Sequence, residues 1–205
     1  KVPMADNAFA LNIGNPPFGS ESLRFQFKPE LAGKSIHNQF FLAGMDALRP
    51  GGIQSMVVSR YLLDAQDKST RLALARQAKL VGAIRLPDTA FKENARTEVV
   101  TDIIFLQKLT PSEQIAASAA VDAYMQKSAT NPGLEKERRE LAARVPSWVE
   151  SKKVPDPLGG EDMNVNGYFA EHPEHIMGVL ERSGSMQHGN DITVRLDNPA
   201  ELESR

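Results

Sequence analysis

The N-terminal part of the chain contains the stretch Ala8-Phe9-Ala10-Leu11-Asn12-Ile13-Gly14-Asn15-Pro16-Pro17-Phe18. Its first six residues are mostly apolar, which is typical of a buried strand, and the Gly-Asn-Pro-Pro that follows is typical of a turn that ends one. Ligands of α/β sheets bind outside the carboxyl ends of the strands. The stretch therefore predicts one strand of an α/β sheet with a candidate site directly after it.

Strands and helices alternate from this stretch to about residue 109. The pattern predicts a helix over 38–48 that ends at Pro50-Gly51-Gly52, a helix from a cap at Asp67 to about Ala78, and strands over 53–58, 80–86 and 99–106. Such alternation is typical of an α/β sheet with parallel strands. The loop over 87–98 shows no helical pattern, so it is compatible with a hairpin and an antiparallel fourth strand.

The chain changes character after residue 109. Thr110-Pro111-Ser112-Glu113 combines a capping box with Pro at the first helical position and predicts a helix to about Lys127, and Asn131-Pro132 predicts the start of another. The stretch over 146–160 is rich in Pro and Gly and is interpreted as a linker or an extended loop, and the tail over 164–196 predicts two short strands. We therefore divide the chain into a sheet domain (1–109), a helical segment (110–145) and a linker with a C-terminal extension (146–205).

The composition is that of a globular protein, with 205 residues of which 41% are hydrophobic and 24% charged. The net charge of -2 is no global signature of nucleic-acid binding, so such binding has to use local patches. The absence of cysteine excludes a disulfide scaffold, a thiolate metal site and a cysteine nucleophile. No apolar run reaches the roughly 18 residues of a membrane helix, and no signal peptide opens the chain, so we expect a cytoplasmic protein. Because the first residue is Lys, we also expect a piece of a larger protein.

The motif Asn15-Pro16-Pro17-Phe18 has the residue types needed to transfer a methyl group to an exocyclic amine such as adenine N6. The lone pair of such an amine is delocalised into the ring, so two hydrogen-bond acceptors would hold the nitrogen in a more nucleophilic form. The side-chain oxygen of Asn15 can be one acceptor, and the carbonyl of Pro16, in an extended backbone, the other. Phe18 offers a flat face to a flipped base, worth about 1–3 kcal/mol per stacked base. The alternative is a Pro-rich turn that only ends a strand.

On these residues the chain resembles the N6-adenine DNA methyltransferases, in which Asn-Pro-Pro-Phe is the catalytic motif after the fourth strand. The resemblance covers residues 6–109: residues 40–52 look like the family's next helix and Gly-rich turn, and residues 85–108 like its following strand, loop and strand. It implies that Asn15, Pro16, Pro17 and Phe18 are catalytic. The tail, with Gly167-Tyr168-Phe169 and His172-Pro173-Glu174-His175, is loosely similar to large helicase–methyltransferase fusions of phages and mobile elements.

The chain departs from the family at the cofactor motif. The family binds S-adenosylmethionine with a Phe-x-Gly-x-Gly turn after its first strand, and no Gly-x-Gly occurs in this sequence. We therefore expect the catalytic half of a Rossmann-like methyltransferase sheet, with only Asn15 bordering the cofactor. The resemblance implies S-adenosylmethionine as the cofactor of the full-length parent. It implies DNA, the missing N-terminal half and a helicase region as partners, in a restriction, anti-restriction or mobile-element setting.

Several further residues have two interpretations each. Phe91 is either a second aromatic residue against the flipped base or a buried loop anchor, and Lys34, Arg24 and Lys28 either follow the phosphates of a target strand or are ordinary surface charges. Arg85 and Arg96 leave the same two choices. His37 and Asn38 either contact phosphate or substrate or, as we expect, cap a helix. We also expect that Trp148 fastens the linker rather than stacks on a base. His172 and His175 are expected to bind no metal, because Pro173 lies between them and no third ligand stands out.

Three functions are compatible with these residues. The first is transfer of a methyl group to adenine N6 in DNA, in one displacement without a covalent enzyme intermediate. The second keeps the reaction and changes the substrate to RNA or a protein glutamine, although Phe18, where the protein-modifying relatives carry Tyr, favours a nucleobase. The third is a non-catalytic module that binds DNA or a partner, which the missing cofactor turn favours and the intact motif opposes.

Overall fold

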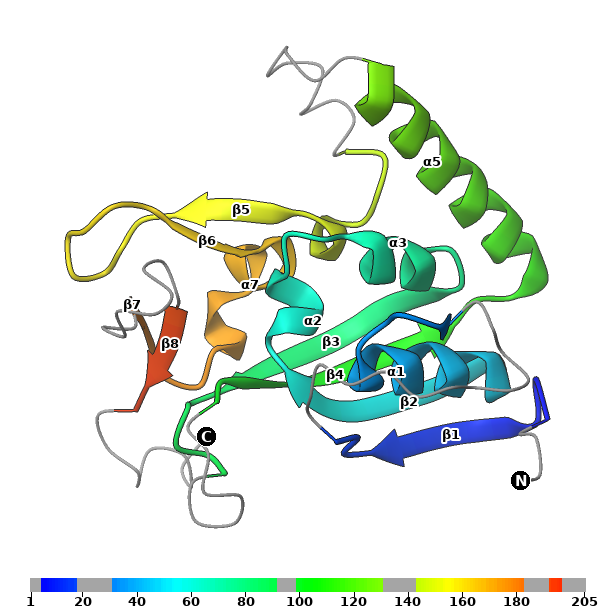
Figure 1. Ribbon diagram of the computed structural model, residues 1–205, viewed down its shortest axis with the longest axis horizontal. Helices are drawn as coiled ribbons and strands as arrows, with labels where there is room; N and C mark the ends of the chain where they lie inside the picture. The colour runs from blue at the N-terminus through cyan, green and yellow to red at the C-terminus, as the bar shows by residue number, and fades with distance from the viewer. Residues whose placement is uncertain (1–4, 18–30, 92–98, 131–142, 183–191, 197–205) are drawn as a thin grey trace.

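The computed structural model describes residues 5–17, 31–91, 99–130, 143–182 and 192–196 (Figure 1). Its centre is a four-stranded sheet in the order β1 (Phe9–Gly14), β2 (Leu48–Ser59), β4 (Thr101–Lys108) and β3 (Ala78–Leu86). β1 and β2 are parallel, and β4 is antiparallel to both β2 and β3, so β1, β2 and β3 run in one direction. The predicted α/β class is confirmed as a partial mixed sheet, in which the hairpin of β3 and β4 turns the fourth strand around.

Helices cover one face of this sheet. α1 (Ile36–Ala47) connects β1 to β2, and α2 (Tyr61–Asp64) and α3 (Ser69–Ala75) connect β2 to β3 (Figure 1). Phe41 and Met45 of α1 are fully buried and belong to the same core as Val58 and Ile104 of the sheet. The expectation that Asp67 caps a helix running to about Ala78 is wrong in position, because Lys68 is the N-cap and α3 ends at Ala75. Asp67 lies one residue earlier, and its Oδ1 accepts a hydrogen bond from the N–H of Ser69, the first residue of α3, at 2.9 Å.

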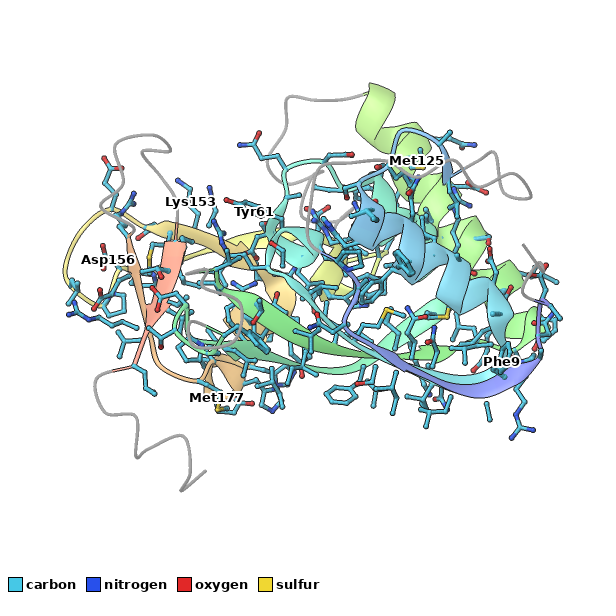
Figure 2. The ribbon with its side chains drawn as sticks, turned by 60° about the horizontal axis from the view of Figure 1, so that its bottom comes forward. Phe9, Tyr61, Met125, Lys153, Asp156 and Met177 are labelled. Carbon is cyan, nitrogen blue, oxygen red and sulfur yellow. The ribbon has the colours of Figure 1, made fainter. Side chains whose placement is uncertain are left out.

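The opposite face of β1 is apolar and exposed. Phe9, Leu11 and Ile13 alternate along the strand and are 49%, 55% and 71% exposed. The expectation of a buried strand is therefore wrong for β1, because no described element packs against this face. Figure 2 shows α1 on one side of β1 and β2 and only side chains on the other. Among the described residues β1 pairs with β2 alone. The sheet therefore has an open edge and a bare apolar face at the same place.

The boundaries around β2 differ from the sequence expectation. α1 ends at Ala47, and Pro50-Gly51-Gly52 lies inside the strand rather than at the helix end. Gly51 has a φ of 76°, which Gly adopts without strain, and Ile53 then begins a regular pairing with β4. The turn-forming residues Pro50, Gly51 and Gly52 therefore lie in the irregular first part of β2.

The region after β4 is a docked extension. α5 (Pro111–Thr130) confirms the predicted helix, and the capping box is present because Glu113 Oε2 accepts from the Thr110 N–H at 2.8 Å. The interpretation of residues 146–160 as a linker is wrong, because η2 (Ser147–Val149) and β5 (Ser151–Val154) lie there and Val149 is fully buried. The predicted anchoring by Trp148 is confirmed, since its side chain is buried in the main core. This Pro-rich stretch packs against the domain because its apolar side chains Trp148 and Val149 belong to the main core.

The tail forms two small hairpins around a short helix. β5 pairs with β6 (Met163–Asn166), and α7 (Gly167–Glu171) and η3 (Pro173–His175) lead to β7 (Val179–Arg182), which pairs with β8 (Ile192–Arg195). The tail thus holds three strands beyond β5 rather than the expected two. Within the described parts of the chain no helix is both long and apolar enough to cross a membrane.

Candidate active site

The candidate site lies at the carboxyl edge of the parallel strands. The register places Gly14 of β1 beside Met56 of β2, and places Ser59 of β2 and Leu86 of β3 on either side of Thr101 of β4. The segments that follow β1, β2 and β3 therefore leave the sheet at one edge. This is the edge at which α/β sheets bind ligands.

The motif after β1 has one buried and two exposed residues. Asn15 and Pro17 are exposed, and Pro16 between them is buried. Pro16 therefore anchors the turn, while the Asn15 side chain reaches solvent beside the strand end. Phe18, the fourth residue of the predicted motif, lies outside the described residues, as do Arg24, Lys28 and Arg96.

The strand that carries Asn15 is braced from behind by a buried amide pair. Asn12 donates to Gln54 Oε1 at 3.0 Å, and Gln54 donates in turn to the carbonyl of Phe41 at 3.1 Å. A Cβ on Gly44 would collide with the side chains of both Asn12 and Gln54. A residue with a Cβ at position 44 would therefore have to displace the hydrogen-bonded amides of Asn12 and Gln54, which link β1 to β2 just before Asn15.

The next described helix after the Asn15 motif is α1, which begins at Ile36. Its N-cap Ser35 makes no side-chain cap hydrogen bond, and the first turn has no acidic residue. His37 is buried, its Nε2 lies 3.3 Å from Ser35 Oγ, and burial lowers the pKa of its imidazole. The expectation that His37 or Asn38 caps the helix is wrong, because Ser35 occupies the cap position and His37 Nδ1 and Asn38 Oδ1 have no hydrogen-bond partner in the described structure.

Arg60 and Tyr61 are further candidate site residues, which the sequence reasoning missed. They follow β2, the strand beside β1, and Tyr61 is 46% exposed (Figure 2). The guanidinium carbon of Arg60 lies 4.5 Å from the centre of the Tyr61 ring, and Arg60 Nη1 lies 3.3 Å from Asp64 Oδ2. An aromatic residue three positions after the end of the predicted strand over 53–58 was the signal available in the sequence.

Arg85 is the core of a buried ion network at the other side of the edge. Its side chain is fully buried and donates from Nε and Nη2 to the two carboxylate oxygens of Asp102, at 2.8 and 2.9 Å. Nη1 lies 2.8 Å from Asp64 Oδ2, and the Phe169 ring covers the guanidinium with its centre 4.3 Å away. Burial acts to lower the pKa of Arg85, but the two carboxylates outweigh it and raise that pKa. Both sequence interpretations of Arg85, phosphate contact and surface charge, are therefore wrong.

Phe91 and Lys34, the two described residues that the sequence predicted to bind substrate, lie in different parts of the structure. Phe91 is partly buried at the end of a turn, and the turn is held by β8, because Asp88 N–H donates to the Val194 carbonyl at 3.1 Å and Thr193 Oγ1 donates to Asp88 Oδ2 at 2.8 Å. Lys34 is half-buried near Asp67: hydrogen bonds from Ser69 lower the pKa of Asp67, and the charge of Lys34 adds to this effect.

The chain matches no protein family model. It is 31% identical over 109 residues to the defense against restriction protein B of Escherichia phage P1, which is 52% of this chain and 5% of the phage protein. Among solved structures it is similar to the M protein of the type I restriction enzyme EcoKI, at 24% identity and a TM-score of 0.40, over 52% of this chain and 22% of that one. It is also similar to a modification subunit of a type I restriction enzyme from Vibrio vulnificus YJ016, at 20% identity and a TM-score of 0.43, over 53% of this chain and 25% of that one.

The chain thus spans a quarter or less of the length of these three proteins. The name of the phage protein refers to defense against restriction, which agrees at a coarse level with the anti-restriction setting that the sequence resemblance implies. Adenine specificity and membership in the Asn-Pro-Pro-Phe family stay predictions.

Proposed function

We propose that this chain supplies the target-binding half of a methyltransferase that acts on adenine N6 in DNA. The observation that carries the proposal is the position of Asn15-Pro16-Pro17: an exposed amide on a buried proline anchor, at the carboxyl end of a braced strand. In this proposal the Asn15 side-chain oxygen and the Pro16 carbonyl accept the two amine hydrogens. Phe18 then stacks on the flipped base.

Tyr61 adds an aromatic surface that the proposal can use. It follows the strand next to β1, and Arg60 and Asp64 constrain its ring from the domain side. A base or nucleotide that reaches Asn15 would pass the end of β2, so we assign Tyr61 to stacking against a nucleotide next to the target. Phe91, held in place by β8, is the second candidate for such a contact.

The residues described here do not fit S-adenosylmethionine as a complete pocket. The cofactor needs a Gly-rich turn after a strand, the sequence has no Gly-x-Gly, and β1, which carries the site, has no strand on its outer side in the described part of the chain. S-adenosylmethionine, the source of a methyl group on a sulfonium, therefore belongs to the proposal for the full-length parent only. We expect isothermal titration of S-adenosylmethionine into this chain to show weak or no binding, and a dissociation constant in the low micromolar range would contradict this assignment.

A non-catalytic binding module is the second candidate, favoured by that same missing pocket. Single-turnover methylation by the full-length parent separates the two proposals. Methyl transfer to DNA that falls sharply in the Asn15→Ala variant supports the catalytic role, whereas a parent that binds DNA without methylating DNA, RNA or protein glutamine supports the module.

A further inference from the structure

The described tail contains a cluster of two imidazoles and a carboxylate, formed by His172, Glu174 and His175 and called here the His–Glu–His cluster. His172 Nδ1 lies 3.1 Å and His175 Nε2 lies 3.8 Å from the same oxygen, Glu174 Oε1. One ligand atom from each side chain lies within 4.8 Å of the others. The cluster is built on the short turn η3, so all three side chains come from neighbouring backbone positions.

These separations are close to those of a metal site. Zn–N and Zn–O bonds of about 2.0–2.2 Å in a tetrahedral site place the ligand atoms roughly 3.4 Å from one another. The two distances to Glu174 Oε1 fall on either side of that value, and all three ligand atoms lie within 4.8 Å of one another. Rotation of the partly exposed side chains would bring the atoms around an ion. Imidazole and carboxylate together are a donor set that Zn²⁺ accepts and that Mg²⁺ does not favour.

Neighbouring groups hold the two rings in place. Tyr168, which is buried, has its hydroxyl 2.7 Å from His175 Nδ1, so the other nitrogen of that ring is the one near Glu174. The His172 and His175 rings are stacked, with centres 5.3 Å apart and planes 16° apart, and the Tyr168 ring lies against both. Because the lone pair of an imidazole lies in its ring plane, one of the two rings has to turn when both nitrogens bind the same ion. A hydroxyl on the second nitrogen of a ligating imidazole is the kind of contact that orients metal-binding histidines.

Glu174 is the third candidate ligand, and the sequence interpretation did not recognise it when it expected no metal. Its carboxylate approaches both histidines only because of the turn on which all three residues lie.

We propose that His172, Glu174 and His175 form a binding site for a divalent transition-metal ion, with Zn²⁺ as the fitting example. Three protein ligands leave room for water or for a further ligand, as in open zinc sites. The cluster stands directly before Ile176 and Met177, and the Met177 N–H donates to the Arg85 carbonyl at 2.8 Å. A bound ion would therefore tie together the tail segment that lies along the carboxyl end of β3. This proposal is independent of the methyl-transfer proposal.

The test is titration of Zn²⁺ into the whole metal-free 205-residue chain, followed by calorimetry, with Mg²⁺ as a parallel titrant. We expect one Zn²⁺ per chain with a dissociation constant in the micromolar range and no Mg²⁺ binding. His175→Ala and Glu174→Gln should each weaken Zn²⁺ binding at least tenfold, and Tyr168→Phe several-fold. Glu161→Gln removes a carboxylate that is 92% exposed in its side chain, outside the cluster, and is the matched control that should bind Zn²⁺ like the wild type.

Melting curves in the presence of a chelator check that each variant is folded. Because the cluster side chains are partly or fully exposed, His175→Ala and Glu174→Gln should melt at the wild-type temperature without metal. No Zn²⁺ binding at millimolar metal overturns the proposal, and so does one-to-one binding that survives in a His172→Ala/His175→Ala double variant. A d–d absorption band on adding Co²⁺ that disappears in that double variant supports it.

Discussion

The carboxyl edge of the sheet has two sides that differ in access to solvent. On the side of β1 and β2, called here the open side, Asn15 and Tyr61 are exposed. On the side of β4 and β3, called here the closed side, Asp102 and Arg85 are fully buried, and the Phe169 ring of the tail covers the Arg85 guanidinium. Polar groups on the open side are accessible to a ligand, whereas the charged groups on the closed side form ion pairs with one another. The difference shows that a charged residue near a ligand-binding edge is no evidence of ligand contact until its partners are known.

The largest effect is expected on the closed side, from Asp102→Ala. Removing this carboxylate leaves the Arg85 guanidinium buried with only Asp64 as a counter-charge, and breaking a buried pair in this way costs about 3–5 kcal/mol of unfolding free energy. Urea unfolding followed by circular dichroism measures it. Asp122→Ala is the control, because Asp122 pairs with Arg76 at the exposed surface and its loss should leave the urea midpoint almost unchanged. Equal midpoint shifts for the two variants would contradict the closed-side interpretation.

On the open side, Asn15→Ala in the full-length parent should slow methyl transfer without loss of stability. Loss of one preorganised polar group at a reacting centre raises the barrier by about 2–4 kcal/mol, or about 30- to 900-fold in rate. DNA affinity should stay nearly intact, because phosphate contacts carry most of it. Single-turnover methylation and a melting curve measure both effects, with Asn15→Asp as the milder variant that keeps an acceptor. An Asn15→Ala protein that melts earlier but methylates at the wild-type rate would reduce Asn15 to a turn residue.

Tyr61→Ala tests whether the ligand-binding part of the open side extends from Asn15 to the end of β2. If the ring stacks on a nucleotide, its removal should weaken binding of single-stranded DNA by about 1–3 kcal/mol, while Tyr61→Phe, which keeps the ring, should bind nearly as tightly as the wild type. Fluorescence anisotropy of a labelled oligonucleotide measures the affinity in the full-length parent. An equal loss in both variants would assign the effect to the hydroxyl, which accepts from Arg60 at 3.3 Å, and not to stacking.

The smallest expected effect is a change in the pH dependence of the free energy of unfolding, caused by the buried His37 of α1. Burial lowers the pKa of His37, so the unfolded chain takes up the proton first as pH falls. The contribution of neutral His37 to stability is therefore complete above the unfolded-state pKa of about 6.5 and is lost progressively below it. Urea unfolding at a series of pH values from neutral to mildly acidic should show this loss, and His37→Gln should flatten that part of the profile. An unchanged profile in the variant would show that another group titrates.

Local features of the fold could be predicted from the sequence because they depend on neighbouring residues. The strand before Asn15, the capping box at Thr110 and the antiparallel fourth strand follow from an apolar run, a capping pattern and a connection without a helical pattern. The end of α1 was misplaced, since Pro50-Gly51-Gly52 is compatible with a turn and with an irregular strand, and only the pairing with β1 decides between them. The linker interpretation of residues 146–160 failed for the same reason, because composition cannot show which apolar side chains find a core.

The sequence by itself determined the order of the elements and the place of Asn15-Pro16-Pro17 after a strand. Only the tertiary structure decided which charges are available. Arg85 reads as a surface cation until the fold brings Asp102, Asp64 and Phe169 around it, and Glu174 reads as an isolated carboxylate until the turn brings both imidazoles to it. The physical reason is that strands, caps and turns are set by contacts within a few residues. Burial and ion pairing instead depend on partners that reach the same point in space from distant parts of the chain.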